Sequence, residues 1–243
     1  MRCAILADIH SNAAALMAVL EDVDRRGGAD ELWLLGDIVG YGPDPHRCFE
    51  ILRRFKCVGV SGNHDLAVLE RLSASGFDPD AAEAVRWTKR QISAEDALFL
   101  SRLEPVVETN GFTLVHGSPR QPAWEYINSL GAAEGNFKCF KTPYCLVGHT
   151  HIPMSFKQEA GATSAAPLSE TVGLVLGKAS LILNPGSVGQ PRDSDPRAAY
   201  ATYDSGSGVF RLHRVSYDIA AVRESMWNAG LPVRMAARLE RGV

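Results

Sequence analysis

Short apolar runs and segments of helical periodicity alternate over roughly the first sixty residues, and this alternation limits the folds open to the chain. Strands joined in this way by helices usually form a parallel sheet, which binds its ligands at the carboxyl ends of the strands. We therefore predict an α/β fold. The predicted strands are Cys3–Ala7, Leu32–Leu35 and Cys57–Val60, and the predicted helices follow a cap at Ser11 and span Pro45–Phe55.

The pattern changes after the third predicted strand. Residues 66–103 are mainly helical in periodicity, with Asp78 and Ser93 as N-caps, and we interpret them as a helical insertion. Composition predicts a loop at Ala160–Glu170 and closing helices or a partly ordered tail at Ile219–Arg241. We expect one domain over residues 1–243. The later strands, expected to be antiparallel, are Phe112–Val115, Tyr144–Val147, Ile152–Phe156, Ser180–Leu183, Ala198–Tyr203 and Val209–Val215.

Composition and charge exclude several classes of protein. An apolar fraction of 46% with 22% charged residues is typical of a folded globular chain. A formal net charge of −3 disfavours a large nucleic-acid surface, so any binding of phosphate must be local. No stretch approaches the ~20 apolar residues of a membrane span. The five cysteines show no paired metal or redox spacing, and their odd number suits a reducing compartment, so we expect a cytoplasmic protein.

Polar clusters rich in histidine follow five of the predicted strands. Each cluster alone is also consistent with a helix cap or a structural histidine. Five such clusters at strand ends instead favour one shared metal site, because their nitrogen and oxygen ligands suit manganese, iron, nickel or zinc. The clusters are Asp8-Ile9-His10, Gly36-Asp37, Gly62-Asn63-His64-Asp65, His116-Gly117-Ser118-Pro119 and Gly148-His149-Thr150-His151.

Taken in order, these clusters resemble the signature of the calcineurin-like metallophosphoesterases. Residues 184–192, Asn-Pro-Gly-Ser-Val-Gly-Gln-Pro-Arg, are similar to a loop of the small bacterial and archaeal phosphodiesterase-like branch of that superfamily. The resemblance implies a four-layer α/β/β/α sandwich of two facing mixed sheets. It also implies hydrolysis of phosphoesters with two divalent metal ions, and we expect manganese.

The resemblance implies a role for each motif residue. One metal would be held by Asp8, His10, Asp37 and His151, and the other by Asp37, Asn63, His116 and His149, so Asp37 would bridge the pair. Two cations ~3.5–4 Å apart can share a hydroxide and aim it in line at phosphorus. His64, which is not a ligand in this scheme, would protonate the leaving oxygen or stabilise the transition state.

Three further residues are candidates for contact with the substrate. Arg120 and Arg192 follow two of the motif loops and can reach a phosphoryl oxygen. Tyr41, in a Gly- and Pro-rich turn, can stack on a base or sugar, and this favours a nucleotide or another small phosphodiester as substrate. The insertion and residues 121–142 can either cover the site or form the face of a homodimer.

The sequence leaves three alternative functions to be considered. Protein Ser/Thr phosphatases share the metal signature, but Gly40 and Tyr41 stand where that branch has Asp and Arg, and Asp65 stands where it has Glu. A phosphomonoesterase is a closer alternative. A binding scaffold without catalysis is a third, and the complete set of ligand positions argues against it.

Overall fold

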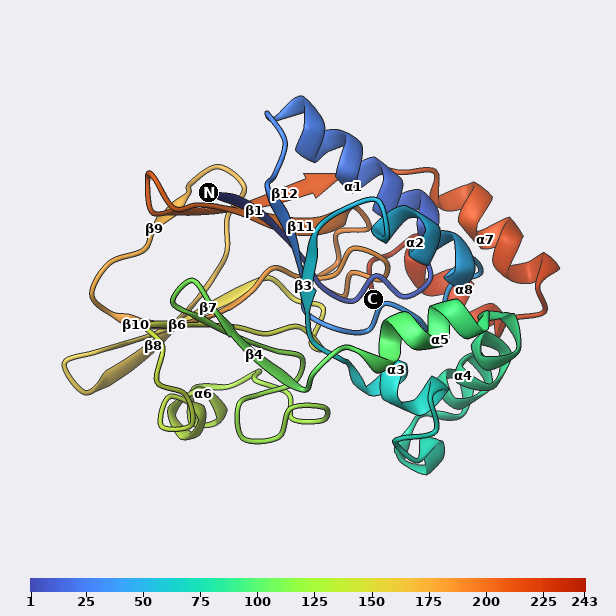
Figure 1. Ribbon diagram of the computed structural model, residues 1–243, viewed down its shortest axis with the longest axis horizontal. Coiled ribbons are helices and arrows are strands. Elements are labelled where there is room, and N and C mark those ends of the chain that lie inside the picture. The colour runs from blue at the N-terminus through green and yellow to red at the C-terminus, as the bar shows by residue number, and fades with distance from the viewer.

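Two six-stranded mixed sheets face each other at the centre of the computed structural model, which describes residues 1–243 (Figure 1). The first sheet has the order β3-β2-β1-β11-β12-β9 and the second the order β4-β5-β6-β10-β7-β8. The strands of the first sheet are β1 (Arg2–Leu6), β2 (Glu31–Leu34), β3 (Cys57–Gly59), β9 (Leu174–Val175), β11 (Ala198–Asp204) and β12 (Val209–Val215). Those of the second are β4 (Val106–Thr109), β5 (Phe112–Val115), β6 (Tyr144–Leu146), β7 (Met154–Glu159), β8 (Ala162–Pro167) and β10 (Ser180–Asn184).

Helices cover the outer face of each sheet. The layers are therefore helix, sheet, sheet and helix, which confirms the predicted four-layer sandwich. The helices are α1 (Ala13–Arg25), α2 (Pro45–Leu52), α3 (Asn63–Val68), the 3-10 turn η1 (Ala74–Gly76), α4 (Pro79–Gln91), α5 (Ala94–Ser101), α6 (Leu130–Asn136), α7 (Ile219–Asn228) and α8 (Val233–Leu239).

Strand β1 shows how the alternation of side chains builds these layers. Ala4 and Leu6 belong to the core beneath α1 and α2, whereas Cys3 and Ile5 point into the core between the two sheets. That inner core also holds fully buried aromatic rings such as Trp33. Burial of each large apolar side chain contributes roughly 1.5–3 kcal/mol, so the inner core fixes how the two sheets face each other.

The predicted β-α-β-α-β opening is confirmed, since β1, β2 and β3 are parallel neighbours. The helix cap differs from the prediction: the side chain of Asn12, not that of Ser11, accepts from the backbone nitrogen of Ala15 at 3.0 Å. Ser11 lies one residue too early and has a positive φ of 53°.

The expectation of antiparallel later strands is only partly correct. Strands β11 and β12 are antiparallel, but β5, β6 and β10 run parallel to one another. The predicted loop at Ala160–Glu170 instead contains β8, paired with β7 across a turn at Ala160 and Gly161. Its small, exposed residues give no apolar alternation, because β8 is an edge strand whose order comes from pairing with β7. Strands β4 and β9 were not predicted.

The two C-terminal helices pack against the helical insertion. Residues of α4, α7 and α8 share one buried cluster with Tyr41, so the end of the chain lies beside the loop after β2. Residues 219–241 therefore form closing helices, which is one of the two predicted alternatives for this segment.

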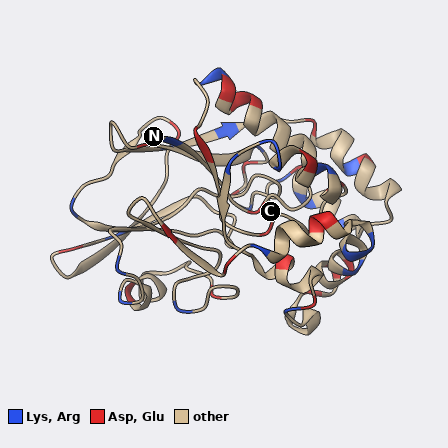
Figure 2. Cartoon of the chain, viewed as in Figure 1, with Lys and Arg blue, Asp and Glu red and all other residues tan.

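Charged residues of both signs are spread over the outer helices in the view of Figure 2. The formal net charge is −3. No helix in the structure has the length and apolar character that crossing a membrane requires.

Candidate metal centre

Five loops bring the predicted ligands together at one edge of the sandwich. They follow β1, β2, β3, β5 and β6, and strands that run parallel present their carboxyl ends at the same edge. All seven side chains are at most 3% exposed, and they are Asp8, His10, Asp37, Asn63, His116, His149 and His151.

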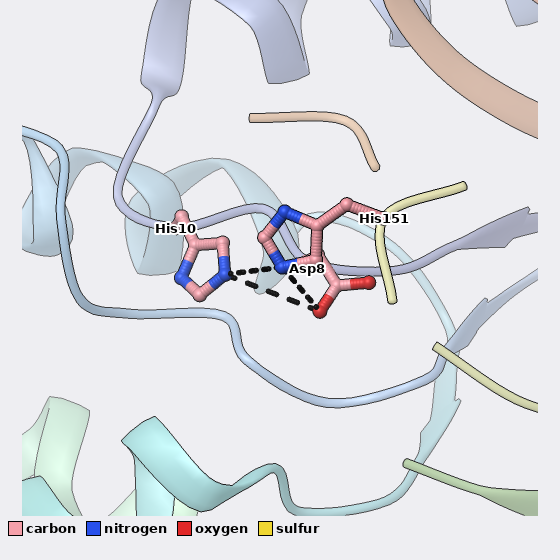
Figure 3. Close-up of side chains that lie close together, drawn as sticks. All are labelled: Asp8, His10 and His151. Carbon is pink, nitrogen blue, oxygen red and sulfur yellow. Dashed lines mark hydrogen bonds and ion pairs between the residues drawn. The ribbon is translucent and has the colours of Figure 1, made fainter. Parts of the chain in front are cut away.

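The first group of ligand atoms comes from the loops after β1 and β6. Nε2 of His10 and Nε2 of His151 lie 3.1 Å apart, and Oδ1 of Asp8 lies 3.3 Å from Nε2 of His151 and 3.9 Å from that of His10. Figure 3 shows the two rings and the carboxylate pointing toward one another. Three ligand atoms from segments about 140 residues apart thus face one small volume.

The second group shares Asp37 with the first. Nε2 of His116 lies 3.0 Å from Oδ1 of Asn63 and 3.1 Å from Nδ1 of His149. Oδ2 of Asp37 lies 3.3 Å from Nε2 of His116 and 3.7 Å from Nε2 of His10. One carboxylate oxygen therefore faces both groups.

The second nitrogen of each of these four rings is bonded to a backbone carbonyl. Each of these nitrogens must carry the proton, because a carbonyl can only accept, so the nitrogen facing the group is left as a bare lone pair in the neutral ring. The bonds are His10 Nδ1 to Val39 O at 3.0 Å, His116 Nδ1 to Leu35 O at 2.8 Å, His149 Nε2 to Trp124 O at 3.2 Å and His151 Nδ1 to Gln190 O at 2.6 Å.

Histidine nitrogens that face each other in pairs test whether metal ions fit between the candidate ligands. The neutral imidazoles of His10 and His151, whose bare nitrogens lie 3.1 Å apart, repel each other unless a cation or a proton lies between them. Metal–nitrogen bonds of ~2.0–2.1 Å place two nitrogens on one ion about 3–3.4 Å apart. Both histidine pairs match this spacing, and carbonyl partners behind ligating histidines are the usual support of a metal site. The residues present therefore fit two divalent cations.

Burial keeps most of these rings in the state that binds metals. It lowers the pKa of His149 to about 2, and it lowers the pKa of His10 and of His151 as well. Burial also lowers the pKa of His116, but the Asp37 carboxylate outweighs it and raises the value to about 9. Asp37 has a pKa well below its usual range, since His116 and His64 overcome its burial.

Strained backbone conformations are concentrated at the ligands. Asp8, His10, Asp37, His149 and His151 all have φ between 48° and 66°, in the left-handed region. This conformation costs a non-glycine residue roughly 1–2 kcal/mol. Five strained residues among seven candidate ligands are consistent with a functional site, where such strain tends to occur.

Backbone groups hold the two carboxylates in place. Asp8 accepts from the backbone nitrogen of His149, and Oδ1 of Asp37 accepts from that of His64 at 2.8 Å. Gly62 passes close to Asp37, because a Cβ there would lie 2.1 Å from Oδ1. Only glycine permits this approach.

His64 lies beside both groups and has no carboxylate partner. Its ring packs edge-on against His10 and Phe77 and lies 4.5 Å from the ring of Tyr41. Its Nδ1 is buried without a hydrogen-bond partner, and burial lowers the pKa of His64 to about 4. Together with His10 and Asp37 it forms a third group within metal-binding distance.

Asp65 does not orient His64. Its carboxylate accepts from the backbone nitrogens of Gly62 and Val39 at 2.9 and 3.2 Å, and so caps α3. His64 is positioned instead by its backbone bond to Asp37 and by its aromatic neighbours. Gly40 leaves room for the ring, because a Cβ at that position would lie 2.4 Å from Nδ1.

A cavity of about 230 Å³ opens beside the two groups. Two of the predicted substrate contacts, Arg192 and Tyr41, line it. Arg120 does not: its guanidinium pairs with Glu125, five residues on, and this local ion pair directs the side chain away from the cavity.

Sequence reasoning missed much of the cavity wall. The insertion supplies Phe77, residues 121–142 supply Trp124 and Tyr126, and α8 supplies Met235 and Arg238. The Trp-Glu-Tyr run soon after the fourth motif could have signalled an aromatic wall, whereas no motif marks Arg238.

Comparison with known proteins decides the family. The model of the calcineurin-like phosphoesterase superfamily domain matches residues 1–208. The chain belongs to this superfamily. It is a phosphoester hydrolase, with His/Asp clusters able to bind divalent metals.

Two relatives match this calcineurin-like phosphoesterase over nearly its whole length. A metallophosphoesterase from Sphaerobacter thermophilus is 42% identical, with a TM-score of 0.90 over 100% of this chain and 99% of that one. An uncharacterized protein of Methanocaldococcus jannaschii, MJ0912, is 36% identical over 98% of this chain and 97% of its own length.

A third relative matches only in part. The symmetrical bis(5'-nucleosyl)-tetraphosphatase of Citrobacter koseri is 36% identical over 104 residues, which is 36% of each chain.

Proposed function

We propose that this phosphoesterase is a dinuclear-metal-dependent phosphodiesterase that acts on a nucleotide or another small phosphodiester. The observation that carries the proposal is the pair of ligand groups joined by Oδ2 of Asp37, since this oxygen faces Nε2 of both His116 and His10. The partial similarity to a bis(5'-nucleosyl)-tetraphosphatase supports a nucleotide substrate.

Each metal would have four protein ligands. Asp8, His10, Asp37 and His151 would hold the first, and Asp37, Asn63, His116 and His149 the second. When bound, divalent cations lower the pKa of water and offset the charge that builds on the phosphoryl oxygens. We expect manganese, although the ligand types also suit iron, nickel and zinc.

His64 would act on the leaving group. Its ring is buried next to both ligand groups, and its low pKa keeps it neutral at pH 7, with one N–H to donate. A neutral imidazole in this place can donate a hydrogen bond to the leaving oxygen and so stabilise the transition state, a contribution of ~10²–10³-fold in rate.

Arg192 would hold a phosphoryl oxygen of the substrate. Its Nη2 bonds to Oε1 of Gln190 at 2.8 Å, its guanidinium carbon lies 5.8 Å from the centre of the Tyr41 ring, and its Nε is buried without an acceptor. A guanidinium held at the cavity wall with an unused donor suits a phosphoryl oxygen.

Base stacking fits other residues better than Tyr41. The Tyr41 ring is 9% exposed and is packed against the rings of His10 and His64. Tyr126, by contrast, is 46% exposed and already stacks on His149 at 3.9 Å. We therefore assign the stacking surface to Tyr126 and its neighbour Trp124.

A protein Ser/Thr phosphatase is disfavoured by the space around His64. That branch has an Asp where this chain has Gly40, yet any Cβ at Gly40 would collide with Nδ1 of His64. Here the imidazole occupies the room that a carboxylate would need.

The proposal is tested by hydrolysis of bis(p-nitrophenyl) phosphate and p-nitrophenyl phosphate by metal-stripped protein, with and without manganese. We expect manganese-dependent cleavage, faster for the diester, that is lost in His64→Ala. His46→Ala, in which a histidine 52% exposed and outside the cavity is removed, is the matched control. Faster cleavage of the monoester would favour a phosphomonoesterase, and no turnover with any divalent metal would favour a binding scaffold.

A further inference from the structure

Two arginines in the cavity wall keep guanidinium nitrogens that bond to no Asp or Glu side chain. Arg192 follows β10 and Arg238 lies on α8, and neither forms an ion pair with an Asp or Glu side chain. Nε of Arg238 donates to an oxygen of Val243, the last residue of the sequence, at 2.6 Å, so its two Nη groups are the donors left for a ligand. Other arginines of the C-terminal helices are paired, as Arg223 is with Glu240.

The two arginines differ in what they line, since both line the cavity but only Arg238 also lines the hollow beside it. The backbone nitrogen of Arg192 donates to the carbonyl of His151 at 3.3 Å, and its guanidinium lies beside Tyr41, which contacts the ring of His10. Arg238 is attached to α8, where it lines both this cavity and an adjoining hollow of about 460 Å³. Arg238 therefore stands at the boundary through which a longer substrate can extend.

The charges of these two residues act on each other. Burial lowers the pKa of Arg238, and the positive charge of Arg192 lowers it further. Asp78 also lines the cavity, but its carboxylate accepts from the backbone nitrogen of Asp80 and caps α4. Two like charges confined in one cavity are stabilised when an anion lies between or beside them.

One guanidinium is enough to contact the scissile phosphoryl group. A second guanidinium, which also lines the adjoining hollow, has no partner in a substrate with a single phosphorus atom. Resting on the proposed function, we infer that Arg238 binds a second phosphoryl group adjacent to the scissile one, so that the preferred substrate is a nucleotide-type diester that carries a phosphate chain. In the reaction, the oxygen of a water molecule forms the new bond to the scissile phosphorus, and the bridging P–O bond breaks. The water gives up one proton, and the departing phosphoryl oxygen gains one.

The test compares a two-phosphoryl probe with a one-phosphoryl probe. Binding of methylenediphosphonate and of inorganic phosphate to metal-free full-length protein is measured by calorimetry. Both are also measured as competitive inhibitors of bis(p-nitrophenyl) phosphate hydrolysis by the manganese-loaded enzyme. A charge-assisted hydrogen bond is stronger than a neutral one, but contact with solvent weakens it, and Arg238 is only partly buried. We therefore expect Arg238→Gln to reduce the preference for diphosphonate over phosphate about tenfold.

Arg90→Gln is the control, because Arg90 is an exposed arginine at the end of α4 that lines neither the cavity nor the adjoining hollow. It should leave the preference as in the wild type, and any chelation of manganese by the probe is common to all variants. Arg238→Lys should recover part of the preference, which separates loss of charge from misfolding. An unchanged preference in Arg238→Gln, or an equal loss in Arg90→Gln, overturns the inference.

The calorimetric arm does not depend on turnover. A wild-type protein that never hydrolyses the single-phosphate diester would refute the proposed function, while the binding preference would still decide the role of Arg238.

Discussion

Gly40 allows the ring of His64 to occupy its place beside the candidate metal ligands. A methyl group at this position would lie 2.4 Å from Nδ1 of His64, whereas ordinary contacts of a Cβ start at 3.4 Å. Gly40→Ala should therefore push the imidazole by about 1 Å, and a displacement of that size can cost ~10²-fold in rate. We expect kcat for bis(p-nitrophenyl) phosphate to fall about 100-fold.

The substitution also carries a backbone cost that must be separated from this effect. Gly40 has a φ of +95°, and alanine in such a conformation costs roughly 1–2 kcal/mol of folding free energy. Gly111→Ala is the control, because Gly111 has a φ of +82° but no atom within 4 Å of an added Cβ. Urea unfolding should show a similar loss of stability for both variants, while only Gly40→Ala loses activity.

A double-mutant cycle tests whether the effect of Gly40→Ala acts through His64. On a His64→Ala background the same substitution should lower kcat no further, and bound manganese, measured by mass spectrometry, should stay at the wild-type level. The reasoning is refuted if Gly40→Ala keeps kcat within threefold of wild type, or if it acts equally strongly without the imidazole.

Three further outcomes are expected. Manganese at 100 times its dissociation constant should raise the free energy of unfolding by about 2.7 kcal/mol per site, and Asp37→Asn should remove most of this gain in denaturant titrations. Asn184→Ala should lower the free energy of unfolding by about 2–3 kcal/mol, since it deletes three buried or partly buried hydrogen bonds of ~1 kcal/mol each. Two of these bonds join Asn184 to Gly148 and Thr150, which flank the candidate ligand His149, so a manganese titration should show weaker binding. Arg120 lowers the pKa of Glu125 to about 2, below the ~4.3 of a Glu in an unfolded chain. The ion pair of Glu125 with Arg120 therefore stabilises the fold above pH ~4.3, and this contribution is lost as pH falls toward 2. Unfolding measured from pH 6 to pH 3 should be less pH-dependent in Glu125→Gln, and an unchanged slope would contradict this assignment.

The clustering of the candidate ligands could be predicted from the sequence, because their positions follow from strand ends. Parallel strands place short motifs such as Asp8-x-His10 at a common edge, where local spacing is enough to bring the side chains together. The same logic identified the β-α-β-α-β opening, since buried central strands have continuous apolar runs.

The cavity wall could not be predicted, because its residues meet only through tertiary packing. Arg238 and Phe77 are more than 150 residues apart, and neither lies in a pattern that ties it to the other. Arg120, a predicted substrate contact, lies outside the cavity lining for a related reason: its position after a motif loop gave no information about Glu125, with which its guanidinium pairs. The edge strand β8 was missed because its pairing, rather than its own composition, determines its conformation.

The left-handed conformations at five of the candidate ligands also bear on attempts to make this protein more robust. Glycine at any of these positions would relieve a backbone cost of roughly 1–2 kcal/mol, so a screen that rewards heat resistance alone would favour the loss of Asp and His side chains. Stabilised variants should therefore be selected in the presence of the metal, whose binding energy would make the strained conformations the favourable ones.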